Sequence, residues 1–306
     1  MSWLFYAITS IFTESPCVFI DNYVSDVYFK DRHAASVKLF FGYAFVIISI
    51  ILAIILQNDF QYFSLASIGF LVLSGCIHSA AYVPYYKALE IEESTTTSIF
   101  QQLAPILYLL ANFFLYGETI SVRQLFGFFV ILCGPATIIM MARKRSRHIR
   151  IKAILYVLLY IVGIVIGNII FLQNQGIGSP NPYLAVVFFV FGKGLMNLIL
   201  VYTNRKWLHR FRTVAKKDKR VFRPLTAILI LNLLTDYFYH TALLVAPAAA
   251  LASAVVDSSI PIVIFFAGIV LTVIWPKFGR EKLTRRNVMA HLIATIFVVA
   301  GIILVK

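Results

Sequence analysis

Residues 85–134 read YYKALEIEESTTTSIFQQLAPILYLLANFFLYGETISVRQLFGFFVILCG, and the order of landmarks in this stretch decides the fold. An aromatic YYKAL ending comes first, Pro105 follows inside an apolar run, and a Gly-Glu hairpin precedes the next apolar run. The same order returns later in the chain as YHTAL at 239–243, Pro261 and FGREKL at 278–283. Landmarks that occur twice in the same order indicate an internal repeat.

The composition places the repeat in a membrane. The chain is 60% hydrophobic and 13% charged with a mean hydropathy of +0.86, whereas about a quarter of the residues in a soluble domain are charged. Its apolar runs have the length of roughly 20 residues that one hydrocarbon crossing requires. We therefore predict an all-α integral membrane protein with about ten transmembrane helices, at 3–24, 37–56, 65–87, 94–116, 121–141, 152–173, 183–203, 224–246, 249–275 and 287–305.

The repeat divides these helices into two halves of five. We expect the first half at 1–142, a basic linker at 143–151 and the second half at 152–306. Because five is an odd number, the second half enters the membrane from the opposite face. Inverted repeats of this kind are common among secondary transporters.

Two loops carry the whole net charge of +14. Residues 143–152 contribute +6 and residues 205–223 contribute +8, while the loops of opposite parity are nearly free of Lys and Arg. The positive-inside rule then places the basic loops in the cytoplasm, both termini outside, and the chain in the plasma (cytoplasmic) membrane. Anionic lipid headgroups are the expected partners of these loops, and nucleic acid is not, because no folded basic module with stacking aromatics accompanies them.

Within the longer basic loop, apolar residues recur at helical spacing. Trp207, Leu208, Phe211 and Ala215 alternate with Arg and Lys. This pattern is typical of a helix that lies on the inner leaflet, although a solvated connector would also fit.

The stretch 85–134 also resembles the first repeat of EamA-type proteins in the drug/metabolite transporter superfamily. The aromatic YxAL ending, the mid-helix proline, the Gly-Glu hairpin and the Gly-containing helix carry the resemblance. It is strongest over 82–134 and weaker over 236–302. The resemblance implies a transporter with a central substrate cavity lined by the third, fourth, eighth and ninth helices.

Polar side chains inside the apolar runs are the candidate site, because a charged Asp at the centre of a spanning helix costs roughly 2.5–3.5 kcal/mol. When the halves are aligned, Tyr82 falls opposite Asp236 and Gln101 opposite Asp257. The residues expected to face a shared cavity are Ser74, His78, Tyr82 and Tyr86 on the third helix, Ser98, Gln101 and Gln102 on the fourth, Asn232, Asp236, Tyr239 and His240 on the eighth, and Ser253 and Asp257 on the ninth.

Two further ionisable residues lie in other spans. Lys193, in the seventh, is a candidate counter-ion for Asp236 or Asp257, and the alternative is a buried pair that only orients helices. Glu14, beside Pro16 in the first span, fits a helix break, a lateral gate or an interfacial position.

These features predict a secondary transporter for a small polar or amphipathic metabolite, acting as a monomer or homodimer. Asp236 or Asp257 would neutralise a cationic group or bind a proton, so transport would be proton-coupled or proceed by exchange. We expect no cofactor, and no metal, because His78 and His291 lack a second ligand at metal spacing.

Two rival functions remain open at this stage. A flippase for a lipid-linked headgroup predicts a cavity open sideways to the acyl chains. An intramembrane enzyme is less compatible, because the chain has no HExxH, no paired-aspartate motif at a membrane edge and no Ser/His/Asp set on adjacent helices. The chain also lacks a GxxxxGK[ST] loop, which argues against direct ATP driving.

Overall fold

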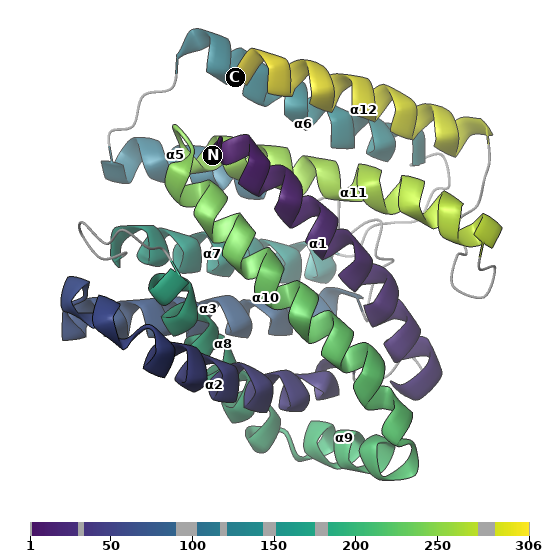
Figure 1. Ribbon diagram of the computed structural model, residues 1–306. Helices are drawn as coiled ribbons and strands as arrows, with labels where there is room; N and C mark the ends of the chain where they lie inside the picture. The colour runs from purple at the N-terminus through teal and green to yellow at the C-terminus, as the bar shows by residue number, and fades with distance from the viewer. Residues whose placement is uncertain are drawn as a thin grey trace.

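The computed structural model describes residues 2–29, 34–89, 103–116, 121–142, 151–174, 183–274 and 285–305. Its helices are α1 (Trp3–Val24), α2 (Lys38–Ile55), α3 (Leu65–Leu89), α5 (Ala104–Tyr116), α6 (Val122–Ala142), α7 (Ile151–Asn174), α8 (Tyr183–Thr203), α9 (Arg205–Lys217), α10 (Phe222–Val245), α11 (Ala249–Ile274) and α12 (Arg285–Val305), as Figure 1 shows. Every predicted span corresponds to one of these helices, and the part at 94–102 lies outside the described residues. The all-α prediction is confirmed.

Seven of the helices are long and apolar enough to cross a membrane, namely α1, α2, α3, α7, α8, α10 and α11. α5, α6 and α12 contain shorter apolar stretches. Large hydrophobic side chains point outward, such as Ile54 on α2 and Ile296 on α12, which are 63% and 68% exposed. An apolar exterior around fully helical segments is what a lipid environment requires, since the backbone groups are satisfied within each helix.

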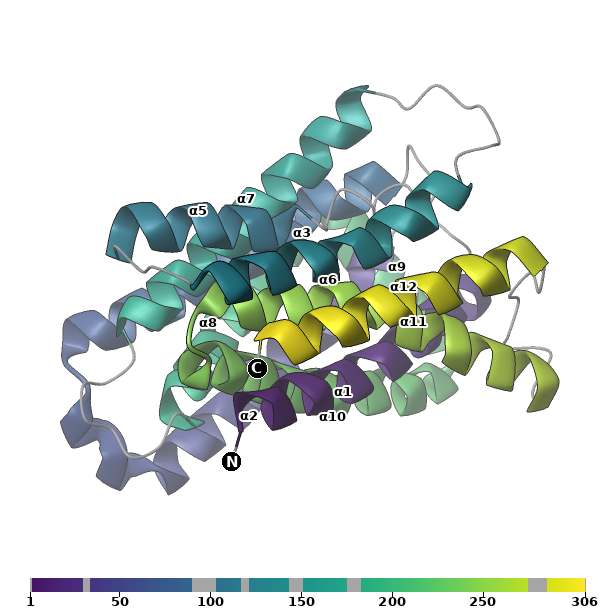
Figure 2. The same cartoon turned by 90° about the horizontal axis from the view of Figure 1, so that it is seen from above.

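The helices pack in pairs that relate the two halves. α1 packs on α10 and α11, α3 packs on α7 and α8, and α6 lies beside α12 (Figures 1 and 2). In chain order, α1, α2, α3, α5 and α6 of the first half correspond to α7, α8, α10, α11 and α12 of the second. When each helix is replaced by its counterpart, the α1–α10 pair becomes the α7–α3 pair. The α6–α12 and α2–α8 pairs map onto themselves. These pairings fit halves related by a two-fold axis, whereas the boundaries 1–142 and 152–306 stay a prediction.

Two glycines bring α3 and α8 into backbone contact. A Cβ atom on Gly75 would collide with the carbonyl oxygen of Phe189, and one on Gly192 with that of Val72. Small residues at a crossing let helix backbones approach closely in membranes. The crossing also positions Lys193, whose backbone nitrogen would lie 2.8 Å from the same Gly75 Cβ.

We expect Gly192→Ala to lower the free energy of unfolding by about 1–3 kcal/mol, because the added methyl group overpacks the crossing. Gly69→Ala is the matched control on α3, since a Cβ there would meet nothing within 4 Å. Thermal unfolding of the detergent-purified protein measures both changes. Equal melting temperatures for the two variants would contradict the close α3–α8 contact.

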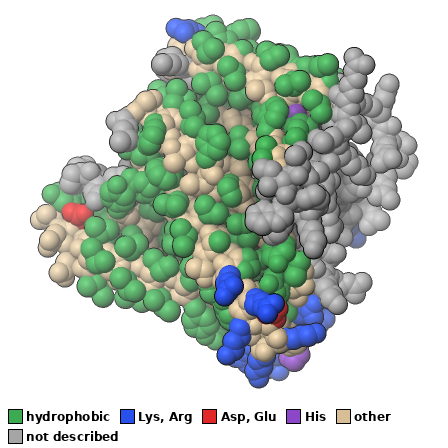
Figure 3. All heavy atoms as spheres, turned by 45° about the vertical axis from the view of Figure 1, so that its right-hand side comes forward, with side chains coloured by type: hydrophobic (Ala, Val, Ile, Leu, Met, Phe, Trp, Pro, Cys, Tyr) green, Lys and Arg blue, Asp and Glu red, His purple; other side chains and the backbone are tan. Residues whose placement is uncertain are grey.

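α9 is amphipathic and carries much of the basic charge. It begins after Asn204, whose side chain accepts a hydrogen bond from the Trp207 backbone N–H at 3.4 Å, and it buries Phe211 and Val214. Lys and Arg side chains gather at the end of the molecule where α9 lies, below a mostly hydrophobic face (Figure 3). The helix expected within 205–223 is therefore confirmed, and its position on the inner leaflet remains a proposal.

Candidate functional site

Lys193 on α8 and Asp236 on α10 form an ion pair inside the helix bundle. The Lys193 ammonium nitrogen lies 2.6 and 2.9 Å from the two carboxylate oxygens, and the side chains are only 13% and 10% exposed. The ammonium group also lies 5.4 and 5.6 Å from the ring centroids of Phe45 and Phe189. Of the two carboxylates that the sequence offered Lys193, the structure pairs it with Asp236.

Glu14 lies near the middle of α1, which runs through Pro16 as one continuous helix. The expectation of a helix break at Glu14 is therefore wrong, whereas a lateral gate or an interfacial position stays a prediction. Its half-buried carboxyl group is within electrostatic range of Asp257, Asp236 and Lys193. Among the described residues, no hydrogen bond or ion pair to this carboxyl group is found. Three helices thus bring three carboxyl groups to one region, which we call the acidic cluster: Glu14, Asp236 and Asp257.

Asp257 on α11 is held by a local hydrogen bond and bordered by tyrosines. The Ser253 hydroxyl donates to its carboxylate at 2.6 Å, one turn earlier on the same helix. Tyr108 and Tyr239 both interact with Asp257 electrostatically and hydrogen-bond to each other. Asn168 of α7 donates a further hydrogen bond to the Tyr108 hydroxyl.

The members of the polar stripe predicted on α10 lie in different surroundings. His240 is fully buried between the rings of Phe171 and Phe189, with centroid distances of 4.4 and 4.2 Å. Its Nδ1 lies 2.7 Å from the backbone oxygen of Asp236. Asn232 is half-buried, and no hydrogen bond to its side chain is found among the described residues.

The stripe predicted on α3 turns partly away from the acidic cluster. Ser74 donates to the Gly167 carbonyl at 2.7 Å and so faces α7, while the His78 ring packs 5.2 Å from Phe189. Tyr82 packs against Tyr160 at 5.2 Å yet remains within electrostatic range of Glu14 and Asp236. Ser98, Gln101 and Gln102, expected on the fourth helix, lie outside the described residues.

A buried lysine that was not among the predicted site residues lies at the start of α2. Lys38 is 5% exposed, and its ammonium group donates to the backbone oxygen of Ser79 at 3.1 Å, to the Ser79 hydroxyl at 3.4 Å and to Asn197 Oδ1 at 3.0 Å. The rings of Tyr82 and Tyr86 lie 5.5 and 5.7 Å away. A single cation in front of an apolar run usually marks a span edge, so its burial had no signal in the sequence.

Residues 25–140 match the model of the EamA-like transporter family. The matched stretch is less than half of the chain. A protein of known crystal structure is similar over 99% of this chain and 96% of its own, with a TM-score of 0.65 and 14% sequence identity. That likeness shows a shared fold that extends through the second half, beyond the matched stretch. No curated protein matches the chain.

The family match makes this chain a multi-pass membrane transporter and not an enzyme. The charges of the acidic cluster suit it to bind a proton or a cationic group. The Glu14 carboxyl group lies within electrostatic range of two others, and Lys193 is already paired with Asp236. A proton or a cationic group of a ligand would relieve the repulsion, because like charges in a low-dielectric interior disfavour full ionisation.

The hydrogen bonds of Lys38 can be tested by mutation. Asn197→Ala removes one of the three acceptors around the ammonium group, so we expect a loss of about 1–3 kcal/mol in the free energy of unfolding. Asn58→Ala, at an exposed position between α2 and α3, is the control. Detergent-phase thermal unfolding compares the two, and equal effects would show that Asn197 contributes nothing to holding Lys38.

Proposed function

We propose that this chain is a secondary transporter that moves a small polar or amphipathic metabolite across the plasma membrane by alternating access. The two halves would rock about the acidic cluster, exposing it to each face in turn. The basic loops lie in the cytoplasm in this proposal, both termini lie outside, and the protein acts as a monomer or homodimer.

One observation carries the proposal, namely the convergence of Glu14, Asp236 and Asp257 from α1, α10 and α11 within spanning helices. Intramembrane ionisable residues are expensive, and they usually mark substrate or ion pathways. Glu14 adds the strongest support, because its carboxyl group lies within electrostatic range of two other acids and no described residue gives it a hydrogen bond or ion pair. Such a group is suited to take up a proton or a cationic group and release it again.

The roles within the site follow from these contacts. Glu14 and Asp257 would receive the proton or the cationic group, while the Lys193–Asp236 pair would hold α8 to α10. Tyr239, Asn232, His240, His78, Tyr82, Gln101 and Gln102 complete the set of proposed substrate-contacting residues. Coupling would use the proton gradient or exchange of one metabolite for another.

A ligand screen by thermal shift tests this proposal. The purified protein is mixed with amino acids, amines, nucleosides or sugar nucleotides, and the unfolding temperature is measured. A ligand at about 100 times its Kd stabilises the folded state by about 2.7 kcal/mol, which corresponds to a shift of several degrees. We expect one class to shift the wild type and to shift Asp257→Asn much less.

Asp59→Asn is the matched control, because Asp59 lies in the short turn Gln57–Tyr62, outside the spanning helices. Its ligand-induced shift should equal that of the wild type. A shift that persists unchanged in both Asp257→Asn and Glu14→Gln would move the ligand away from the acidic cluster and contradict the proposal.

A further inference from the structure

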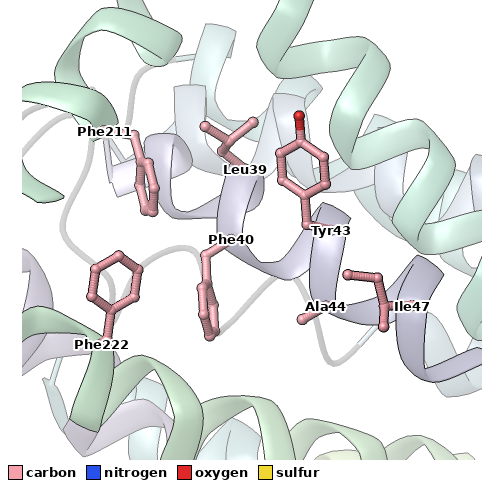
Figure 4. Close-up of a pocket in the computed structure, with 7 residues that line it drawn as sticks. All are labelled: Leu39, Phe40, Tyr43, Ala44, Ile47, Phe211 and Phe222. Atoms are coloured by element: carbon pink, nitrogen blue, oxygen red, sulfur yellow. The ribbon is translucent and has the colours of Figure 1, made fainter.

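A lateral apolar groove opens between α2, α9 and α10. It has a volume of about 360 Å³, within the roughly 300–1,000 Å³ range of ligand pockets. Figure 4 shows the rings of Phe40, Phe211 and Phe222 converging at one end, with Tyr43 and Ile47 further along α2. The seven lining residues are Leu39, Phe40, Tyr43, Ala44, Ile47, Phe211 and Phe222. None of them is charged, so the groove suits a hydrocarbon chain.

Two exposed arginines follow lining residues in the chain at the α9 end of the groove, and we call them its basic rim. Phe211 is followed in the chain by Arg212 and Phe222 by Arg223, and both arginines are exposed. Arg212 also interacts electrostatically with Tyr43, whose hydroxyl group hydrogen-bonds to that of Tyr202. An exposed guanidinium group near an apolar groove suits the phosphate of an anionic lipid, and the groove suits its acyl chain.

The groove runs along α2 for a length close to the thickness of one leaflet. From Leu39 to Ile47 it follows α2 for eight residues, or about 12 Å at the helical rise of 1.5 Å per residue. Half of a bilayer's hydrocarbon core is about 15 Å thick. An acyl chain that enters at α9, where the basic rim lies, would therefore run along α2 toward the bilayer centre.

The groove also occupies a gap in the helix packing. The α2–α10 contact is the counterpart of the α3–α8 contact in the other half, yet α2 and α10 touch at few points while α3 and α8 meet at Gly75 and Gly192. An open contact on a lipid-facing surface has to be filled, because an empty apolar void forfeits dispersion contacts.

We propose that the groove binds one anionic phospholipid of the inner leaflet as a resident partner, with an acyl chain between α2 and α10 and its phosphate at Arg212 and Arg223. This site is independent of the proposed substrate site, because none of the seven lining residues belongs to the acidic cluster. The groove has no charged side chains along its length, so a lipid headgroup has no polar path through it. We therefore expect the lipid to stay bound in the groove and not to be transported.

The test uses quenching of Trp207, which lies one turn from Phe211 on the same face of α9. In a Trp3→Phe/Trp275→Phe background, the protein is reconstituted with phosphatidylglycerol or phosphatidylcholine that carries brominated acyl chains. Each basic residue near an anionic surface contributes about 1 kcal/mol, a factor of about five in affinity. We expect phosphatidylglycerol to bind about tenfold or more tightly than phosphatidylcholine, and Arg212→Gln/Arg223→Gln to remove that preference.

Two variants separate the site from diffuse attraction. Lys216→Gln/Lys217→Gln changes the same charge on α9, beyond the groove, and should keep most of the preference. Ala44→Phe should fill the groove and weaken quenching by both lipids, whereas Ile51→Phe, at an exposed α2 position outside it, should not. Equal quenching by both lipids in the wild type would mean annular lipid only and overturn the site. An equal loss in both charge variants, or protein-dependent movement of fluorescent phosphatidylglycerol across proteoliposomes, would overturn it as well.

Discussion

Replacing Lys193 by methionine is expected to lower the free energy of unfolding by about 3–5 kcal/mol, because it leaves a buried carboxylate without its counter-ion. Asp236 accepts both of its side-chain contacts from Lys193, and no other described residue donates to its carboxylate. Asp236→Leu should be destabilising for the converse reason, since it strands the ammonium group between the rings of Phe45 and Phe189. Chemical or thermal unfolding in detergent measures each loss.

The double variant Lys193→Met/Asp236→Leu should recover most of the stability that each single variant loses. Apolar residues of similar volume often replace a buried ion pair at no net loss, so the two changes should be strongly non-additive. Lys152→Met, at an exposed position near the start of α7, is the control and should change stability little. Additive losses in the double variant would mean that the two side chains act independently. Uptake by a stable double variant would support the proposal that the pair only holds α8 to α10.

The spans were predictable because the bilayer imposes one demand on every residue inside it. A helix that crosses hydrocarbon has to be apolar over about 20 residues, so hydropathy gave α8 at its observed bounds and α7 within one residue at each end. The amphipathic helix α9 followed from the spacing of Trp207 and Phe211 among basic residues. The burial of Lys38 could not be predicted in this way. Hydropathy cannot distinguish a lysine at the edge of a span from one that packs against Ser79 and Asn197.

The sequence indicates which polar residues lie inside the apolar spans, but it does not indicate which of them contact one another. Hydropathy exposes a polar residue in an apolar run, which is how Glu14 and Lys193 entered the candidate list. Which carboxylate Lys193 meets depends on helix rotation and on the α3–α8 crossing, and neither can be read from spacing along one helix. The same reason explains why Ser74, expected in the cavity, faces α7, and why the Tyr108–Asn168 contact had no signal in the sequence.

Glu14→Gln is expected to abolish most transport without loss of stability, the opposite outcome to the Lys193 variant. Glutamine keeps the shape of the side chain but can neither ionise nor hold the proton. If the carboxylate makes one charge-assisted contact with the ligand worth about 1.5–3 kcal/mol, uptake at low ligand concentration falls roughly tenfold to a hundredfold. Stability should stay the same or rise, because the neutral amide removes a repulsion with Asp257 and Asp236.

Uptake into proteoliposomes of the ligand found by thermal shift, with the unfolding temperature measured in parallel, checks both halves of this prediction. Asp21→Asn is the control, because it makes the same chemical change on α1 at an exposed position two turns away, and it should keep wild-type uptake. A Glu14→Gln protein that transports normally would remove Glu14 from the coupling role. A variant that unfolds at a temperature several degrees lower would instead assign Glu14 a structural role. Such a loss would mean that its carboxylate stabilises the folded helix bundle.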